Sequence, residues 1–135
     1  MLIQLKEHLQ SNNLIDPFQS AYREKHSTES ALLRIMNDIL RSIDSGSVTI
    51  LTMLDLSAAF DTIDHSILLN RLSVNFGISG MALTWFTSYL TERSQSVYVE
   101  GNYSSDFKLM YGVPQGSVLG PVLFTMYMLP LGKNF

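Results

Sequence analysis

This chain of 135 residues contains no cysteine, which excludes a disulfide, a thiolate nucleophile and a zinc–sulfur site. Its histidines, His8, His26 and His65, lie far apart and show no paired spacing, so we expect structural or solvent-facing roles for them. If the chain binds a metal, it must rely on oxygen ligands, which favour a hard ion such as Mg²⁺.

Long apolar runs and an excess of positive charge are also missing. The apolar stretch Val118–Leu131 is interrupted by Gly120, Pro121 and Pro130, and no run reaches the roughly 18 residues that indicate a membrane-spanning helix. Charged residues follow Met1 too closely for a signal peptide. The net charge is −3, whereas a protein that binds nucleic acid by itself is expected to be basic.

An apolar stretch ends at a single carboxylate in the segment VTILTMLDLSAAFDTIDH, residues 48–65. Val48–Leu54 carries no charge and is rich in β-branched and aliphatic residues, which predicts a strand buried on both faces of a sheet. Ligands in open α/β sheets bind at the carboxyl ends of such strands, so Asp55 is a candidate for metal binding or proton transfer. Capping or solvating the following turn is the alternative for Asp55 and the preferred interpretation for Asp61 and Asp64.

Helical spacing of apolar residues predicts most of the remaining elements. The expected helices are Leu2–Leu14, a long helix that begins after the N-cap Ser27, Ser66–Phe76, Gly80–Thr91 and Ser117–Leu129. Gln95–Glu100 and Tyr103–Tyr111 are expected to be strands of a hairpin that turns at Gly101-Asn102.

The helix expected at Ser117–Leu129 is apolar nearly all round, so other elements must enclose it. Only six residues follow it, and we therefore expect a fragment that lacks the cover of this helix. Such a chain would expose apolar surface and could self-associate through it.

The segment GVPQGSVLGP, residues 112–121, is a second candidate site. Glycine and proline shape a turn before the last helix, and Gln115 is the only amide side chain in it. Either the turn serves the backbone alone, or free N–H groups at the helix start bind an anionic or nucleotide ligand. The segment is not a phosphate-binding P-loop, because the required lysine is absent.

Together these segments resemble the two central motifs of reverse transcriptases from non-LTR (LINE-type) retrotransposons. The motifs are DLSAAFDTIDH (residues 55–65) and GVPQGSVLGPVLF (112–124). QSAYREKHSTESALL (19–33) is similar to the family's fingers motif, and ALTWFTSYLTERSQSVYVEG (82–101) resembles the stretch between its palm motifs. The resemblance implies RNA-directed DNA polymerisation in retrotransposition by an intracellular protein, nuclear or cytoplasmic. Its implied partners are an RNA template, a DNA primer and deoxynucleoside triphosphates, without a membrane.

The resemblance also assigns residues of the first motif. It makes Asp55 the first metal-binding, catalytic aspartate of the palm, which holds Mg²⁺ with the Leu56 carbonyl as an additional ligand. Phe60 corresponds to the aromatic residue beneath the sugar of the incoming nucleotide, which discriminates against a 2′-hydroxyl by contact.

Further site residues follow from the other motifs of the resemblance. Gln115 and Gly116 correspond to the loop that lines the nucleotide and template site. Arg23 corresponds to the fingers region that meets the triphosphate, although Ala21 and Lys25 depart from the glycine-richer form usual there.

The implied fold is α+β: a partial right-hand polymerase in a single incomplete domain. Its fingers-like parts would be residues 1–46 and 66–111, and its palm-like parts residues 47–65 and 112–135. The family's YADD hairpin, which carries the other metal-binding aspartates, and its thumb do not occur in this sequence. Because two-metal catalysis needs carboxylates from two strands, we expect the chain to be inactive alone and to bind Mg²⁺ weakly or not at all.

Two alternatives remain open. The chain could be a non-enzymatic remnant of a retroelement that acts at most as an interaction module. It could also be an unrelated Mg²⁺-dependent enzyme that uses Asp55, Asp61 and Asp64, but this would require a second strand ending in a carboxylate, which the sequence does not show.

Overall fold

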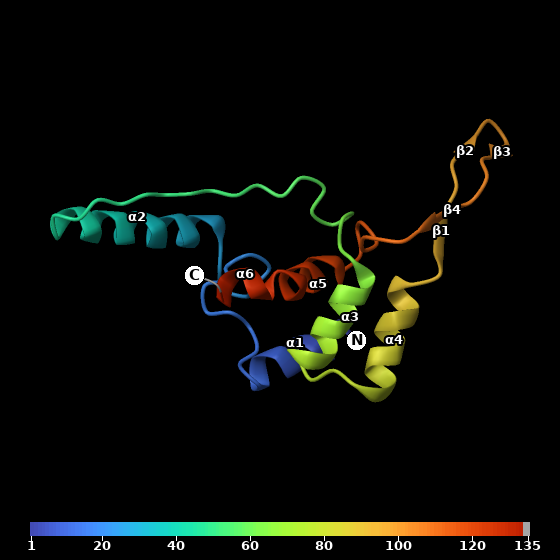
Figure 1. The fold of residues 1–135 in the computed structure, drawn as a ribbon, viewed down its shortest axis with the longest axis horizontal. Helices are drawn as coiled ribbons and strands as arrows, with labels where there is room; N and C mark the ends of the chain where they lie inside the picture. Colours follow the sequence, from blue (N-terminus) through green and yellow to red (C-terminus); the bar gives the residue numbers. More distant parts are fainter. Residues whose placement is uncertain (134–135) are drawn as a thin grey trace.

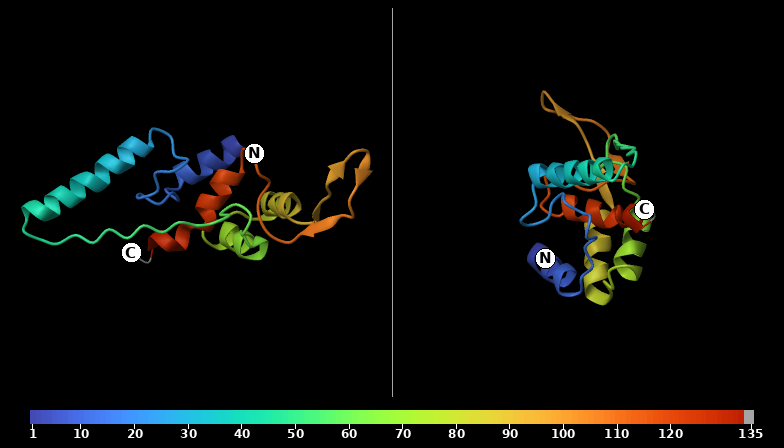
Figure 2. Two further views of the ribbon diagram at one scale, coloured as in Figure 1. Left: turned by 90° about the horizontal axis from the view of Figure 1, so that it is seen from above. Right: turned by 90° about the vertical axis from the view of Figure 1, so that its left-hand side faces the viewer.

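A helical body with two extensions makes up residues 1–133, the part of the chain that the computed structural model describes (Figure 1). The helices of the body are α1 (Leu2–Ser11), α3 (His65–Val74), α4 (Gly80–Leu90), α5 (Gly120–Tyr127) and α6 (Leu129–Lys133). An arm, formed by α2 (Thr28–Asp44) and the extended chain that leads from its end back to the body, and a β-hairpin project from the body in different directions (Figure 2). The mixture of helices and small sheets confirms the predicted α+β class, while residues 134 and 135 of the expected palm-like part lie outside the described range.

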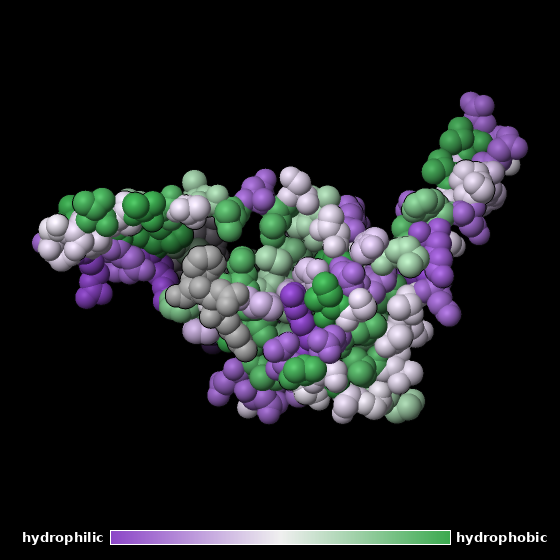
Figure 3. Space-filling view, in the orientation of Figure 1, coloured by the Kyte–Doolittle hydropathy of each residue, from purple (hydrophilic) through white to green (hydrophobic). Residues whose placement is uncertain are grey.

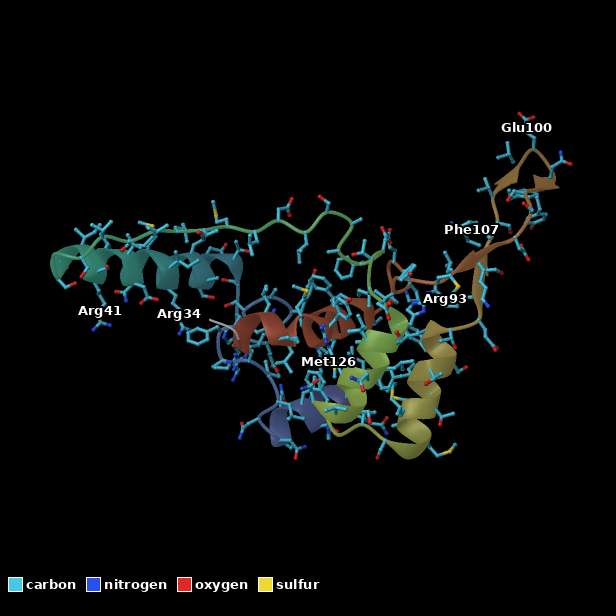
Figure 4. The ribbon with its side chains drawn as sticks, in the orientation of Figure 1. Arg34, Arg41, Arg93, Glu100, Phe107 and Met126 are labelled. Carbon is cyan, nitrogen blue, oxygen red and sulfur yellow. The ribbon has the colours of Figure 1, made fainter. Side chains whose placement is uncertain are left out.

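The hydrophobic core gathers around α3, which packs against α4 and α5. The most deeply buried large side chains are Ile63, Leu68, Leu72, Phe86, Leu90 and Leu123. Leu5 and Leu9 attach α1 to the same core, and Met126 of α5 joins them with 2% of its surface exposed (Figure 4). Burial of apolar surface is the dominant favourable term in folding, so this cluster holds the body together.

Side-chain caps start two of the helices as the sequence predicts. Ser27 accepts a hydrogen bond from the Ser30 backbone N–H, and the Ser30 hydroxyl accepts one from the Ser27 N–H. At the start of α3, the Asp64 carboxylate accepts from the Ile67 N–H at 2.9 Å. These bonds satisfy donors that have no partner in the first helical turn. The helices predicted at residues 2–14, after Ser27 and at 80–91 are confirmed, and the one predicted at 66–76 is confirmed with a start one residue earlier, at His65.

The last predicted helix is present as α5, but it starts at Gly120 instead of Ser117. Val122 and Leu123 are buried against the core. Arg71 of α3 donates to the Tyr127 carbonyl, and its guanidinium carbon lies 4.6 Å from the centroid of the Tyr127 ring. The expectation that this helix lacks its cover is wrong, because α3 and the rest of the core supply it.

The buried strand predicted at Val48–Leu54 is also wrong. Residues 48–56 form an extended segment that leads from the far end of the arm back toward the body (Figure 1) without strand pairing, and Val48 and Ile50 are 92% and 87% exposed. An apolar run favours extended backbone, but a strand also needs a neighbour whose N–H and C=O groups pair with its own. No strand within residues 1–133 pairs with this segment. Asp55 therefore does not end a buried strand here.

Apolar side chains of α2 face solvent, and none of its residues is buried. The exposed large ones are Leu32, Leu33, Ile35, Met36, Leu40 and Ile43. Figure 3 shows an apolar upper edge of the arm, which includes the returning chain, above a polar lower side. Arg34 and Arg41 project from that lower side (Figure 4). Exposed apolar residues thus lie on the arm, and also on the hairpin, while the large apolar residues of α5 are buried or half-buried. No helix in the described range, α2 included, is long and apolar enough to cross a membrane.

The predicted hairpin consists of two short antiparallel ladders. β1 (Arg93–Gln95) pairs with β4 (Phe107–Leu109), and β2 (Tyr98–Val99) pairs with β3 (Asn102–Tyr103). The turn is Glu100-Gly101, one position earlier than predicted, with φ values of 48° and 85°. Positive φ at both central residues suits a two-residue hairpin turn, because its twist matches that of the strands.

Replacing a leucine of the core should cost far more stability than the same change on the arm. Leu68→Ala removes a side chain with 0% exposure and should lower the free energy of unfolding by about 2–5 kcal/mol. Leu33→Ala, at 71% exposure, is the matched control and should change it by less than about 0.5 kcal/mol. Urea unfolding followed by circular dichroism measures both, and equal losses would contradict the assignment of the core.

Candidate functional site

Backbone hydrogen bonds join residues 60–65 to residues 111–116 beside the start of α3, and this junction is the candidate site. The Gly112 N–H donates to the Ile63 carbonyl at 2.8 Å, and the Val113 N–H donates to the Phe60 carbonyl at 2.9 Å. Asp64 and Tyr111 form an antiparallel bridge next to them. The two motifs DLSAAFDTIDH and GVPQGSVLGP are therefore in direct main-chain contact.

Gly112 permits this close approach. Its φ is +84°, and a Cβ atom at this position would lie 3.0 Å from both the Cα and the carbonyl oxygen of Asp61. Another residue would strain its own backbone and press on main-chain atoms that cannot rotate away. Gly116 in the same loop has a similar φ of +74° but open space around it, so only Gly112 is required by contact.

His65 reinforces the junction from the first turn of α3. The residue is 7% exposed, and its Nε2 lies 2.7 Å from the Gly112 carbonyl oxygen. A carbonyl oxygen can only accept, so Nε2 carries the proton in this bond. The structural role expected for this histidine is confirmed.

The Gln115 side chain contacts Asp61 across the junction. Gln115 Nε2 lies 3.0 Å from Asp61 Oδ1 and 3.2 Å from Oδ2. The predicted role in capping or solvating the turn is confirmed for Asp64 by its bond to α3. Asp61 is exposed, as a solvating role requires, but it caps no helix and its carboxylate meets Gln115. The partners are 54 positions apart in the chain, and no local spacing signals such a pair.

Phe60 lies at the same junction and packs against α5. The side chain is half-buried, and the centroids of the Phe60 and Phe124 rings are 5.1 Å apart. Aromatic pairs at this separation stabilise each other beyond their buried area. The ring is thus fixed next to the segment that carries Asp61 and within the same junction as Gln115.

Asp55 and Leu56 precede the junction at the end of the extended segment, and both are exposed. Ala58, with φ of 52°, turns the chain between them and Phe60. Residues 1–133 contain no group of three or more histidine or acidic side chains that could hold a metal ion. Mg²⁺ usually keeps several water ligands and binds through one or two protein carboxylates, and the metal-binding role of Asp55 and Leu56 stays a prediction.

Arg23 lies away from the junction in the loop before α2. Its guanidinium donates to the carbonyls of Asp16 and Gln19 at 3.3 Å, which closes that loop. None of the hydrogen bonds within residues 1–133 joins Arg23 to the junction. The structure therefore brings together Phe60, Gln115 and the adjacent Gly116, but not Arg23.

Comparison with known proteins identifies the family. Residues 1–135 match the family described as reverse transcriptase (RNA-dependent DNA polymerase). This chain belongs to the reverse transcriptase family. It is 34% identical over 113 residues to the RNA-directed DNA polymerase from mobile element jockey of Drosophila melanogaster. It is also 29% identical over 127 residues to the probable RNA-directed DNA polymerase from transposon BS of the same species. The resemblance to retrotransposon polymerases is confirmed.

This reverse transcriptase chain corresponds to a small part of its relatives. The jockey match covers 84% of the chain but 12% of the relative, and the transposon BS match covers 94% of the chain but 14% of the relative. A Pol polyprotein from the type-1 retrotransposable element R2 of Popillia japonica is 32% identical over 75 residues. No solved structure matches the chain.

Substitution of Gly112 should weaken the junction more than substitution of its neighbour. Both Gly112→Ala and Gly116→Ala place a Cβ at positive φ, but only the first meets the Asp61 main chain. We expect Gly116→Ala to lower the free energy of unfolding by about 1 kcal/mol and Gly112→Ala by roughly 2–4 kcal/mol. Thermal and urea unfolding compare the two, and equal effects would contradict the close approach at Gly112.

The Asp64 cap of α3 should make the free energy of unfolding depend on pH. The Ser66 hydroxyl and the Ile67 N–H donate to Asp64 and hold the pKa of its carboxyl below the usual value of 3.8. A lowered pKa stabilises the fold above pH 3.8, and this contribution is lost as the pH falls through the folded-state pKa. Asp64→Asn should therefore be less stable than the parent chain near neutral pH, with the difference shrinking below pH 3.8. Urea unfolding at several pH values measures this, with Asp106→Asn on the hairpin as control. A constant difference would refute it.

Proposed function

We propose that this chain forms part of the nucleotide-binding site of an RNA-directed DNA polymerase. The observation that carries the proposal is the junction itself, which holds Phe60 and Gln115 together from segments far apart in the sequence. Membership of the reverse transcriptase family supports it. The proposed partners are an RNA template, a DNA primer and deoxynucleoside triphosphates.

The proposal includes an arrangement of fingers and palm. Residues 47–65 and 112–135 would belong to the palm, and residues 1–46 and 66–111 to the fingers. The contact between residues 60–65 and 111–116 supports this division, because it joins the two palm-like parts. In this division the hairpin and α2 of the arm belong to the fingers-like ranges, and the extended residues 48–56 of the arm belong to the palm-like range.

The proposed site residues have separate roles. Asp55, with the Leu56 carbonyl, would contribute oxygen ligands to a magnesium site. When bound, Mg²⁺ supplies charge stabilisation for phosphoryl transfer. Phe60 would lie beneath the sugar of the incoming nucleotide and exclude a 2′-hydroxyl.

The remaining proposed contacts come from the loop after β4 and from the loop before α2. Gln115 and Gly116 would line the nucleotide and template site, and both are exposed at the junction. Arg23 would meet the triphosphate, which requires that its loop move toward the junction. Acting alone, the chain would bind Mg²⁺ weakly and would not extend a primer, because the described residues contain no group of three or more histidine or acidic side chains that could hold a metal ion.

An interaction role is the second candidate function, because α2 and residues 48–56 expose an apolar surface. Contiguous exposed apolar patches mark contact sites of proteins. In this role the chain would act as a retroelement remnant that binds a polypeptide or a second copy of itself through the arm. Asp55 and Phe60 would then have no chemical role, which separates this candidate from the first.

The test of the polymerase role needs this chain within a complete enzyme. We would replace the matching segment of the jockey polymerase with residues 1–135 and measure primer extension on an RNA template. Asp55→Asn should reduce extension by at least about 100-fold, because the amide keeps the shape but loses the charge that attracts the metal. The control variant Asp106→Asn should extend the primer as well as the parent enzyme does.

The same enzyme tests Phe60. Phe60→Val should raise the use of ribonucleotides relative to deoxyribonucleotides by roughly tenfold or more, since the ring no longer blocks the 2′-hydroxyl. Unchanged sugar selectivity would exclude this role for Phe60. A folded parent enzyme without extension, or an Asp55→Asn variant as active as the parent, would contradict the polymerase role of the chain.

A further inference from the structure

We propose that Asp61 is a positioning residue that fixes the orientation of the Gln115 amide. Both oxygens of the Asp61 carboxylate lie within 3.2 Å of Gln115 Nε2. Asp61 makes no other side-chain hydrogen bond within residues 1–133, and the cap of α3 is provided by Asp64. The Asp61 carboxylate therefore bonds to Gln115 and does not cap α3.

The backbone on each side of this pair is held in place. The Asp61 N–H donates to the Ala58 carbonyl at 2.9 Å, and the Gly112 Cα approaches the Asp61 main chain closely. Val113, two positions before Gln115, donates to Phe60, directly before Asp61. Because both ends are anchored, the side-chain pair has a defined geometry even though both residues are exposed.

The chemistry of the two groups selects one of two amide orientations. An ionised carboxylate only accepts hydrogen bonds, while the glutamine amide donates through nitrogen and accepts through oxygen. Asp61 must therefore face Nε2, since the reversed amide would set its oxygen against a negative charge. Gln115 Oε1 is then left to accept a hydrogen bond from another molecule.

This inference rests on the proposed polymerase function for the identity of that molecule. The substrate group that meets Gln115 would be a hydrogen-bond donor, such as a hydroxyl or an amino group of the nucleotide or template. Without Asp61 the amide would occupy both orientations, and a flexible glutamine would lose side-chain freedom on binding. Asp61 would therefore affect substrate binding through Gln115 while touching no substrate itself.

The pairing can be tested on the chain itself by nuclear magnetic resonance. The side-chain amide signals of Gln115 in the ¹⁵N-labelled chain are assigned by their loss in Gln115→Ala. Asp61→Asn and Asp61→Leu should move these signals, and Asp106→Asn should leave them in place. Unmoved Gln115 signals in both Asp61 variants would overturn the inference whatever the chain's function.

The effect on substrate is tested by a double-mutant cycle in the jockey enzyme that carries residues 1–135. Asp61→Leu should lower kcat/KM by between about 10-fold and 100-fold, mainly through KM, because the misplaced amide meets the substrate poorly. Asp61→Glu, which keeps a carboxylate, should lower kcat/KM less than Asp61→Leu does. In the Gln115→Ala background, Asp61→Leu should have little further effect, because residues that act through one contact are not additive.

Two outcomes of the cycle separate the inference from the proposed function. Additive losses from Asp61→Leu and Gln115→Ala, in an enzyme that extends primers, would overturn the inference and leave the polymerase role intact. A folded parent enzyme without extension would overturn the polymerase role and with it the substrate contact, while the Gln115 signals would still decide whether the pairing exists.

Discussion

The close approach of Gly112 to Asp61 is the contact on which the candidate site depends. It allows backbone bonds to form between residues 60–65 and 111–116, and His65 adds a side-chain bond to the Gly112 carbonyl. Gln115 can meet Asp61, the residue after Phe60, only because the two backbones are fixed relative to each other at this point. A side chain at position 112 would force the segments apart and separate the groups that the proposed function needs together.

The junction is supported by the hydrophobic core beneath it. Ile63, inside the first segment, is 0% exposed, and Phe60 packs on α5 through Phe124. Each segment therefore combines backbone bonds to the other with side chains anchored in the body. This combination explains how exposed groups such as Asp61 and Gln115 can keep a fixed geometry on a loop surface.

The arm shows a different physical situation. α2 is well formed because Ser27 and Ser30 cap it and its apolar residues share one face, yet that face meets no core. The extended residues 48–56 also have suitable side chains for a strand but no strand partner within the described range. The arm thus contains a helix, whose hydrogen bonds join residues close in the chain, but no strand, which would need hydrogen bonds to a separate segment.

The same distinction separates what the sequence by itself determined from what only the tertiary structure decided. Helix positions, the Asp64 cap and the hairpin follow from local spacing and capping, so they were predictable, as was the family from its motifs. The unpaired state of Val48–Leu54, the cover of α5 and the Asp61–Gln115 pair were not predictable, because each depends on whether a distant part of the chain provides a partner. Backbone pairing, burial and side-chain contact between distant segments arise only when the chain folds, and no local pattern encodes them.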